Sequence, residues 1–157
     1  MIRMIYTVKI EQTYHNPNRM KYIAQTDSFV EENVRSLAYE RNVRQPYGWI
    51  KESGTPPCRH LDVYVMTDKE YRPGDEERIK IIGVFRRNDG DNKLVGVPED
   101  RETEDFSELT EEEKGDMHRL YPMEAPGEGW FGRECAEEII REFFQRKSEE
   151  SPLRNRD

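Results

Sequence analysis

Residues 78–98 read RIKIIGVFRRNDGDNKLVGVP, two apolar runs separated by a short polar segment. The polar segment is Asn88-Asp89-Gly90-Asp91, and an Asp-Gly step between apolar runs is a strong signal for a tight turn. The sequence therefore predicts a β-hairpin with strands over residues 78–87 and 92–98. An isolated hairpin is marginally stable in water, so further strands are needed, and the upstream sequence supplies them.

Three upstream segments have strand character. Residues 5–11 and 60–67 alternate along the chain, and residues 20–24 form a shorter run after a turn. The alternation in residues 60–67 places Leu61, Val63 and Val65 on one face and Asp62, Tyr64 and Met66 on the other. Residues 29–50 are ambiguous between strand and loop. Residues 53–57 are loop, because their two prolines exclude a helix.

Helices are expected only after residue 100. Thr110-Glu111-Glu112-Glu113 matches a capping box and begins a helix that Pro122 ends. A last helix is expected from about Arg133 to Lys147, followed by a frayed polar tail over residues 148–157. Strands followed by separate helices predict a single α+β domain over residues 1–147, most simply a small closed barrel with two C-terminal helices packed outside.

Charge and hydropathy exclude several classes of function. The chain of 157 residues has a net charge of −8, and residues 99–116 hold ten acidic side chains against Arg101 and Lys114. This acidity argues against nucleic acid as a primary partner, which would require a basic face. No apolar run is long enough to span a membrane, and residues 1–6 lack the pattern of a signal peptide, so we expect a cytoplasmic protein with no membrane partner.

One group of polar side chains is a candidate for chemistry. Asp62 is on the polar face of its strand, Asp89 and Asp91 flank the hairpin turn, and Lys93 begins the returning strand. Carboxylates with no His or Cys beside them suit a hard cation such as Mg²⁺, and a nearby lysine would neutralise a phosphate. The alternative is that the Asp-Gly segment serves only the conformation of the turn.

The cysteines and histidines give no comparable signal. Cys58 and Cys135 are far apart in the sequence and are expected to be small buried or half-buried apolar residues. The histidines lie near no evident nucleophile and are expected to have ordinary surface roles; they are His15, His60 and His118.

The order of motifs resembles that of the soluble family I inorganic pyrophosphatases over nearly the whole chain. The hairpin Ile82–Phe85 and Gly90–Pro98 is similar to the "GVL…GEDDKILAVP" segment of that family, and Glu128-Gly129-Trp130 reproduces its "EGW". Three weaker matches accompany these: Tyr47–Ile50 to "NYGFIP", His60–Thr67 to "PLDVLVLT" and Asp105–Leu109 to "DI.DLP". Tyr121 falls where the family has "HYK". Six motifs in the right order make the resemblance specific.

The resemblance implies a five-stranded OB-like barrel and Mg²⁺-dependent hydrolysis of pyrophosphate, or of another phosphoanhydride, by a homo-oligomer; Mn²⁺ is an alternative metal. Carried over by position, the implied metal ligands are Asp62, Asp91, Glu11 and, less directly, Asp89. Asp62, Asp91 and Lys93 are the implied catalytic residues. The implied substrate-binding residues are Lys21, Arg35, Tyr47, Lys93 and Tyr121.

The chain departs from the family where the metals would bind. Pro57 and Arg59 stand at the first two aspartates of the Asp-Gly-Asp-Pro-x-Asp signature, and only Asp62 retains its third. Further replacements fall on Ile23, Val43 and Pro122. Fewer carboxylates neutralise less metal charge, so we expect reduced or altered activity. Arg59 is expected to pair with Asp62 or to contact a substrate phosphate.

Two other functions stay open at this stage. A non-catalytic protein could keep the barrel and bind phosphate compounds or a protein partner. A structural subunit could instead use the acidic segment 99–116 to dock a partner, although a solvated loop and helix start is the favoured interpretation of that segment.

Overall fold

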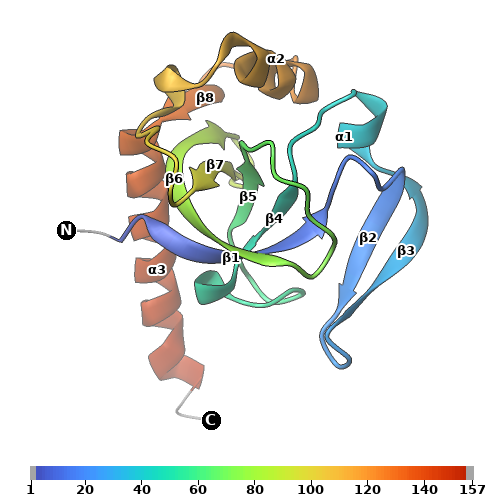
Figure 1. Ribbon diagram of the computed structural model, residues 1–157. Coiled ribbons are helices and arrows are strands. Elements are labelled where there is room, and N and C mark those ends of the chain that lie inside the picture. Colours follow the sequence, from blue (N-terminus) through green and yellow to red (C-terminus); the bar gives the residue numbers. More distant parts are fainter. Residues whose placement is uncertain (1–2, 155–157) are drawn as a thin grey trace.

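The structure is a computed structural model that describes residues 3–154, with side chains described to residue 150. Its centre is a closed five-stranded barrel, because β1 pairs with both β4 and β6 and so joins the two ends of the sheet (Figure 1). The strands follow the order β1 (Ile5–Gln12), β4 (Tyr47–Ile50), β5 (Asp62–Val65), β7 (Lys93–Pro98) and β6 (Glu76–Arg86). The predicted α+β class and closed barrel are confirmed.

The predicted hairpin forms β6 and β7, which pair antiparallel from Ile79–Pro98 to Phe85–Lys93. Gly90 in its turn has a φ of 82°, a conformation that glycine adopts without strain. β7 also pairs with β5, and this pair is parallel, with Asp62 opposite Lys93. Two polar side chains from segments thirty residues apart are therefore neighbours on one sheet.

The ambiguous segment 29–50 divides into three elements. β3 (Ser28–Arg35) forms a separate hairpin with β2 (Asn18–Ile23), the short helix α1 (Leu37–Glu40) follows, and β4 then enters the barrel. Figure 1 shows the β2–β3 hairpin projecting beside the barrel. Alternation alone could not resolve this segment, because most side chains of β3 are exposed on both faces.

Two apolar cores lie on the two sides of the barrel wall. Leu61, Val63 and Val65 point into the barrel, as predicted, and α3 (Arg133–Arg154) packs Ile140 and Phe143 against the same core. On the outer side, Tyr64 and Met66 pack beneath α2 (Glu111–Leu120). α2 begins with the predicted capping box of Thr110 and Glu113. A strand that sequence analysis did not predict, β8 (Gly129–Gly132), pairs with β6.

The remaining elements are two short 3-10 helices, η1 (Lys51–Ser53) and η2 (Phe106–Glu108). None of the helices in residues 3–154 is long and apolar enough to span a membrane.

The prediction of a frayed tail after Lys147 is wrong for residues 148–154, because α3 continues to Arg154. The residues beyond Lys147 include good helix formers, and Glu150 forms an ion pair with Arg59 of the loop before β5. Residues 155–157 of the expected tail lie outside the described residues. The prediction for Cys58 is also wrong, since its side chain is exposed, whereas Cys135 is half-buried as expected.

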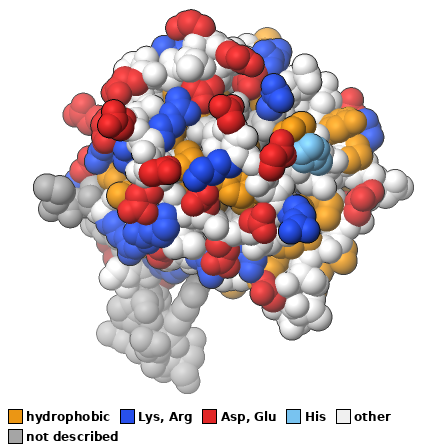
Figure 2. Space-filling model, in the orientation of Figure 1, with side chains coloured by type: hydrophobic (Ala, Val, Ile, Leu, Met, Phe, Trp, Pro, Cys, Tyr) orange, Lys and Arg blue, Asp and Glu red, His pale blue; other side chains and the backbone are white. Residues whose placement is uncertain are grey.

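The acidic segment 99–116 uses many of its carboxylates within the fold. Glu113 pairs with Arg101 in two hydrogen bonds, and the buried Asp116 accepts one from Gln45. Glu104 pairs with Lys80 and Arg133. Figure 2 shows acidic and basic side chains interspersed over one face of the molecule. These contacts favour a structural role for the segment over a docking patch.

Replacing Gly48 should destabilise the barrel, because a Cβ there would lie 2.0 Å from the backbone oxygen of Lys9 on β1. We expect Gly48→Ala to lower the free energy of unfolding by about 3 kcal/mol. Gly115 in α2 is the control position, because a Cβ there would have no neighbouring atom nearer than 3.8 Å. Gly115→Ala should raise the free energy of unfolding by about 0.5–1 kcal/mol. Urea unfolding of both variants checks this; equal effects would contradict the strand packing described.

Candidate functional site

An ion pair between Asp62 and Lys93 is the centre of the candidate site. The parallel register of β5 and β7 places both residues at the start of their strands, and Lys93 Nζ lies 2.9 Å from Asp62 Oδ2. Both side chains are largely buried. Burial alone would lower the pKa of Lys93, but the charge of Asp62 raises it overall, so the lysine is a cation.

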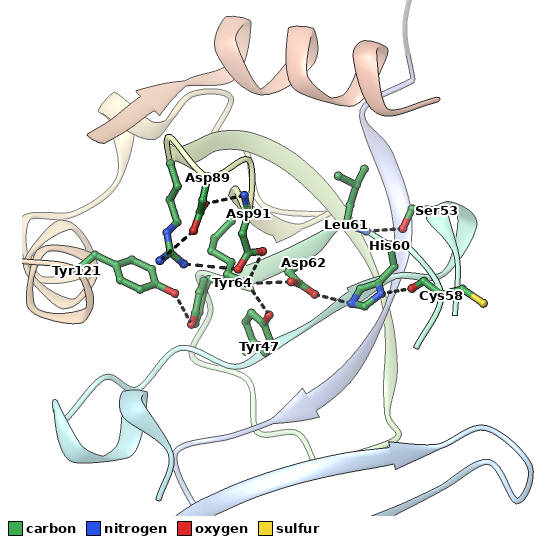
Figure 3. Close-up of polar contacts among 12 residues, drawn as sticks. Tyr47, Ser53, Cys58, His60, Leu61, Asp62, Tyr64, Asp89, Asp91 and Tyr121 are labelled. Carbon is green, nitrogen blue, oxygen red and sulfur yellow. Dashed lines mark hydrogen bonds and ion pairs between the residues drawn. The ribbon is translucent and has the colours of Figure 1, made fainter. Parts of the chain in front are cut away.

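Two aspartates of the hairpin turn extend this pair into a network (Figure 3). Asp91 Oδ1 lies 3.1 Å from Lys93 Nζ. The other oxygen of Asp91 lies 3.6 Å from the guanidinium of Arg87, which also lies 3.7 Å from Asp89. The structure therefore brings Asp62, Asp91 and Lys93 together as predicted, with Asp89 at the exposed margin and Arg87 as an additional member.

His60 is a member of the network that sequence analysis missed. Its Nε2 lies 3.0 Å from Asp62 Oδ1, and its Nδ1 lies 2.7 Å from the backbone oxygen of Cys58. A carboxylate and a carbonyl only accept hydrogen bonds, so these two contacts favour the protonated form of the ring. Burial opposes this charge, but the bond to Asp62 raises the pKa of His60 overall. The sequence signal for His60 was its spacing of two residues from Asp62, because residues two apart in an extended segment share a face.

Glu11 at the end of β1 is the unpaired carboxyl group of the site. Burial raises its pKa to about 7, and the nearby charge of Asp62 adds to this effect. The side chain makes no hydrogen bond or ion pair with any residue in the described part of the chain. By contrast, burial would raise the pKa of Asp62, but the hydrogen bond from His60 and the charge of Lys93 lower it overall.

Three tyrosines form the wall of the site toward α2. Tyr47 on β4 lies beside Tyr64, and Lys93 donates to its hydroxyl at 3.3 Å. The Tyr64 and Tyr121 hydroxyls are 3.4 Å apart, and the Tyr121 ring stacks on Phe85. The pKa of Tyr47 is well above its usual value because of burial and the charge of Asp62, so its hydroxyl keeps its proton. Tyr47 and Tyr121 are thus placed near the cluster, as predicted.

Two other predicted substrate-binding residues have different surroundings. Arg35 pairs with Glu40 and lies over the ring of Tyr39, where β3 ends and α1 begins. Lys21 is exposed on β2 and has no ion pair within residues 3–154. The structure does not bring either of them into contact with the Asp62–Lys93 cluster.

The expected pairing of Arg59 with Asp62 is wrong. Arg59 points toward α3, where it pairs with Glu150 and lies 5.0 Å from the ring centre of Phe143. Residues 56–61 form a turn and a bend before β5 begins, and this loop carries Arg59 toward α3. His60, one residue closer, takes the place beside Asp62.

The carboxylates do not fit a resident metal ion as they are arranged here. Among the described residues, no group of three or more Asp, Glu, His and Cys side chains is placed to hold one. Both oxygens of Asp62 are occupied by His60 and Lys93, and Asp91 is held between Lys93 and Arg87. A divalent cation would have to displace these side-chain cations.

Comparison with known proteins identifies the family of the chain. The closed five-stranded barrel defines the class as an OB-like barrel protein. Residues 8–148 match the family model "Inorganic pyrophosphatase", and the chain belongs to this family. No protein in a curated set of sequences matches it significantly.

Solved structures of bacterial pyrophosphatases share the fold. An inorganic pyrophosphatase from Neisseria gonorrhoeae is 21% identical, with a TM-score of 0.71 and 90% of each chain covered. The enzyme from Thermus thermophilus is 18% identical, with a TM-score of 0.68 and 91% of each chain covered. That from Helicobacter pylori is 16% identical, with a TM-score of 0.66, covering 92% of this chain and 96% of the other. The five-stranded OB-like barrel expected from the resemblance is confirmed.

Glu11→Gln should stabilise the protein at high pH. The pKa of Glu11 is about 7 in the folded state and near 4.5 when unfolded, so its contribution to stability is present below pH 4.5 and is lost as pH rises toward 7. We expect the variant to be more stable than wild type by about 2 kcal/mol at pH 8 and nearly equal to it at pH 4.

Urea unfolding in EDTA at the two pH values measures this difference. Glu102→Gln removes an exposed glutamate and should change stability by less than about 0.5 kcal/mol at either pH. A Glu11→Gln variant no more stable than wild type at pH 8 would show that burial does not raise the pKa of Glu11 as described.

Proposed function

We propose that the protein hydrolyses a phosphoanhydride, with pyrophosphate as the first substrate to test, at the site around Asp62 and Lys93. Family membership supports pyrophosphate hydrolysis as the class of reaction. The observation that carries the proposal is the buried lysine held between Asp62 and Asp91, with a tyrosine hydroxyl beside it. This arrangement keeps a fixed positive charge and a hydrogen-bond donor where phosphate oxygens would lie.

The roles of individual residues follow from their positions. Lys93 would bind a phosphate oxygen, and the Tyr47 and Tyr121 hydroxyls would donate hydrogen bonds to it. Asp62 and Asp91 would hold Lys93 in place and orient a water molecule. Lys21 and Arg35 could contribute only after their hairpin moves toward the cluster, since Arg35 is paired with Glu40.

Mg²⁺, or Mn²⁺ in its place, is the cofactor that family membership predicts. The metal would supply a more acidic bound water and neutralise phosphate charge. Asp62, Asp89, Asp91 and Glu11 are the predicted ligands, but the replacement of two signature carboxylates by Pro57 and Arg59 removes donors from this set. Loss of a group that activates the nucleophile costs about 10²–10⁴-fold in rate, so we propose a reduced activity.

Assembly and location are part of the same proposal. Val30, Val34 and Leu37 are exposed apolar side chains on β3 and α1, which is the kind of surface that a homo-oligomer would bury. Both cysteines are free, which supports a reducing compartment such as the cytoplasm.

Phosphate release from pyrophosphate tests the hydrolase proposal directly. We expect slow turnover with Mg²⁺ or Mn²⁺, and Lys93→Gln should reduce it by at least about tenfold because the phosphate loses its buried cation. Absence of turnover with several divalent metals would reject hydrolysis of pyrophosphate.

A non-catalytic phosphate-binding protein is the second candidate. The supporting observation is that His60, Lys93 and Arg87 already neutralise the three carboxylates that would otherwise bind metal. Calorimetry with pyrophosphate, phosphate and nucleotides distinguishes the candidates, because this one requires binding without phosphate release.

Restoring the family carboxylates should improve the site for metal. We expect Pro57→Asp combined with Arg59→Asp to raise both Mg²⁺ affinity and pyrophosphate hydrolysis, because two acidic oxygen donors replace an apolar residue and a cation. Pro57→Ala with Arg59→Ala is the matched control, since it removes Arg59 without adding donors. If the aspartate variant binds Mg²⁺ no better than the alanine variant, the proposed correspondence with the family signature is wrong.

A further inference from the structure

A pocket of about 520 Å³ opens between the hairpin turn, the loop before β5 and α3, and it borders the Asp62–Lys93 cluster. We call it the α3 pocket and define it by Arg86 and Arg87 of the hairpin, His60 and Asp62 of the loop and strand, and Glu142 and Arg146 of α3. Its volume is in the range of sites for small ligands. Pyrophosphate contacts at Lys93 and Tyr47 would leave most of this space unused.

Arginines on both sides make the pocket rich in hydrogen-bond donors. Arg86 and Arg146 form no ion pair with other described residues, although Arg86 reaches Cys135 across the pocket. Arg87 lies 3.6 and 3.7 Å from its aspartate partners, too far for good hydrogen bonds. Each guanidinium carries five N–H donors in a planar fork that matches phosphate oxygens.

Carboxylates around the pocket set a limit on its positive charge. Asp62 and Asp91 are neutralised within the cluster by Lys93, His60 and Arg87. Glu138 and Glu142 on α3 also line the pocket and have no ion pair among the described residues. They would repel an anion and therefore weaken its binding, so removing one of these carboxylates should strengthen it.

We propose that the α3 pocket binds an inorganic phosphoanhydride longer than pyrophosphate, through Arg86, Arg87 and Arg146 and without a divalent metal. The described carboxylates do not fit a resident metal ion. In place of a metal, the side-chain cations would neutralise the negative charge of the bound phosphates. The Lys93 end of the site would hold one phosphate, and the arginines would hold those beyond it. This inference rests on the proposed function only in taking a phosphoanhydride as the ligand.

Calorimetry of the full chain in EDTA, with sodium tripolyphosphate and sodium pyrophosphate as probes, tests the proposal. We expect tripolyphosphate to bind several-fold more tightly than pyrophosphate, and Arg146→Gln or Arg86→Gln to weaken tripolyphosphate by about tenfold. Glu142→Gln should tighten it about two- to threefold, because a repelling charge is removed. Arg141→Gln is the matched control, since Arg141 is an exposed arginine of α3 that pairs with Glu137 and does not line the pocket.

The outcomes separate this inference from the proposed function. Absence of tripolyphosphate binding in EDTA, or equal binding by Arg146→Gln and Arg141→Gln variants with unchanged thermal unfolding, overturns the inference. Metal-supported phosphate release could still be observed in that case, so the hydrolase proposal would survive. Arginine-dependent binding in EDTA without phosphate release under any metal supports the inference and rejects the hydrolase proposal.

Discussion

The ion pair between Asp62 and Lys93 constrains the rest of the site. Two largely buried charges on adjacent strands stabilise each other. Removing either one would leave the other with a single ion partner, which is His60 for Asp62 and the exposed Asp91 for Lys93. The parallel register of β5 and β7 places them side by side, within the barrel that β1 closes by pairing with β4 and β6. Tyr47, Asp91 and His60 each contact one member of this pair. The strand pairing of the barrel therefore determines where the side chains of the site lie.

The site pairs its aspartates with side-chain cations. Asp62 contacts His60 and Lys93, and Asp91 contacts Lys93 and Arg87. The charges of these side chains therefore nearly cancel. A neutral site attracts divalent cations less strongly and tolerates phosphate anions better.

Much of this architecture could be predicted from local patterns. The Asp-Gly turn located the β6–β7 hairpin, and alternation placed Asp62 opposite Leu61, Val63 and Val65. The spacing of two residues was the only signal for His60 beside Asp62. The partner of Arg59 could not be predicted, because it depends on the bend of the loop before β5 and on where α3 crosses it. The extent of α3 was missed for a similar reason, since a contact distant in sequence supports its last turns. Local periodicity carries no information on such contacts.

The attachment of the loop before β5 to α3 has a consequence for how this sequence can change over time. Arg59 is held by Glu150 and Phe143, and Lys147 donates to the backbone oxygen of Ser53 at the start of the same loop. An aspartate at position 59 would set its carboxylate against that of Glu150. Such a substitution would therefore cost stability unless Glu150 on α3 changed as well. The sequence of this loop is in that sense coupled to the sequence of a helix about ninety residues away.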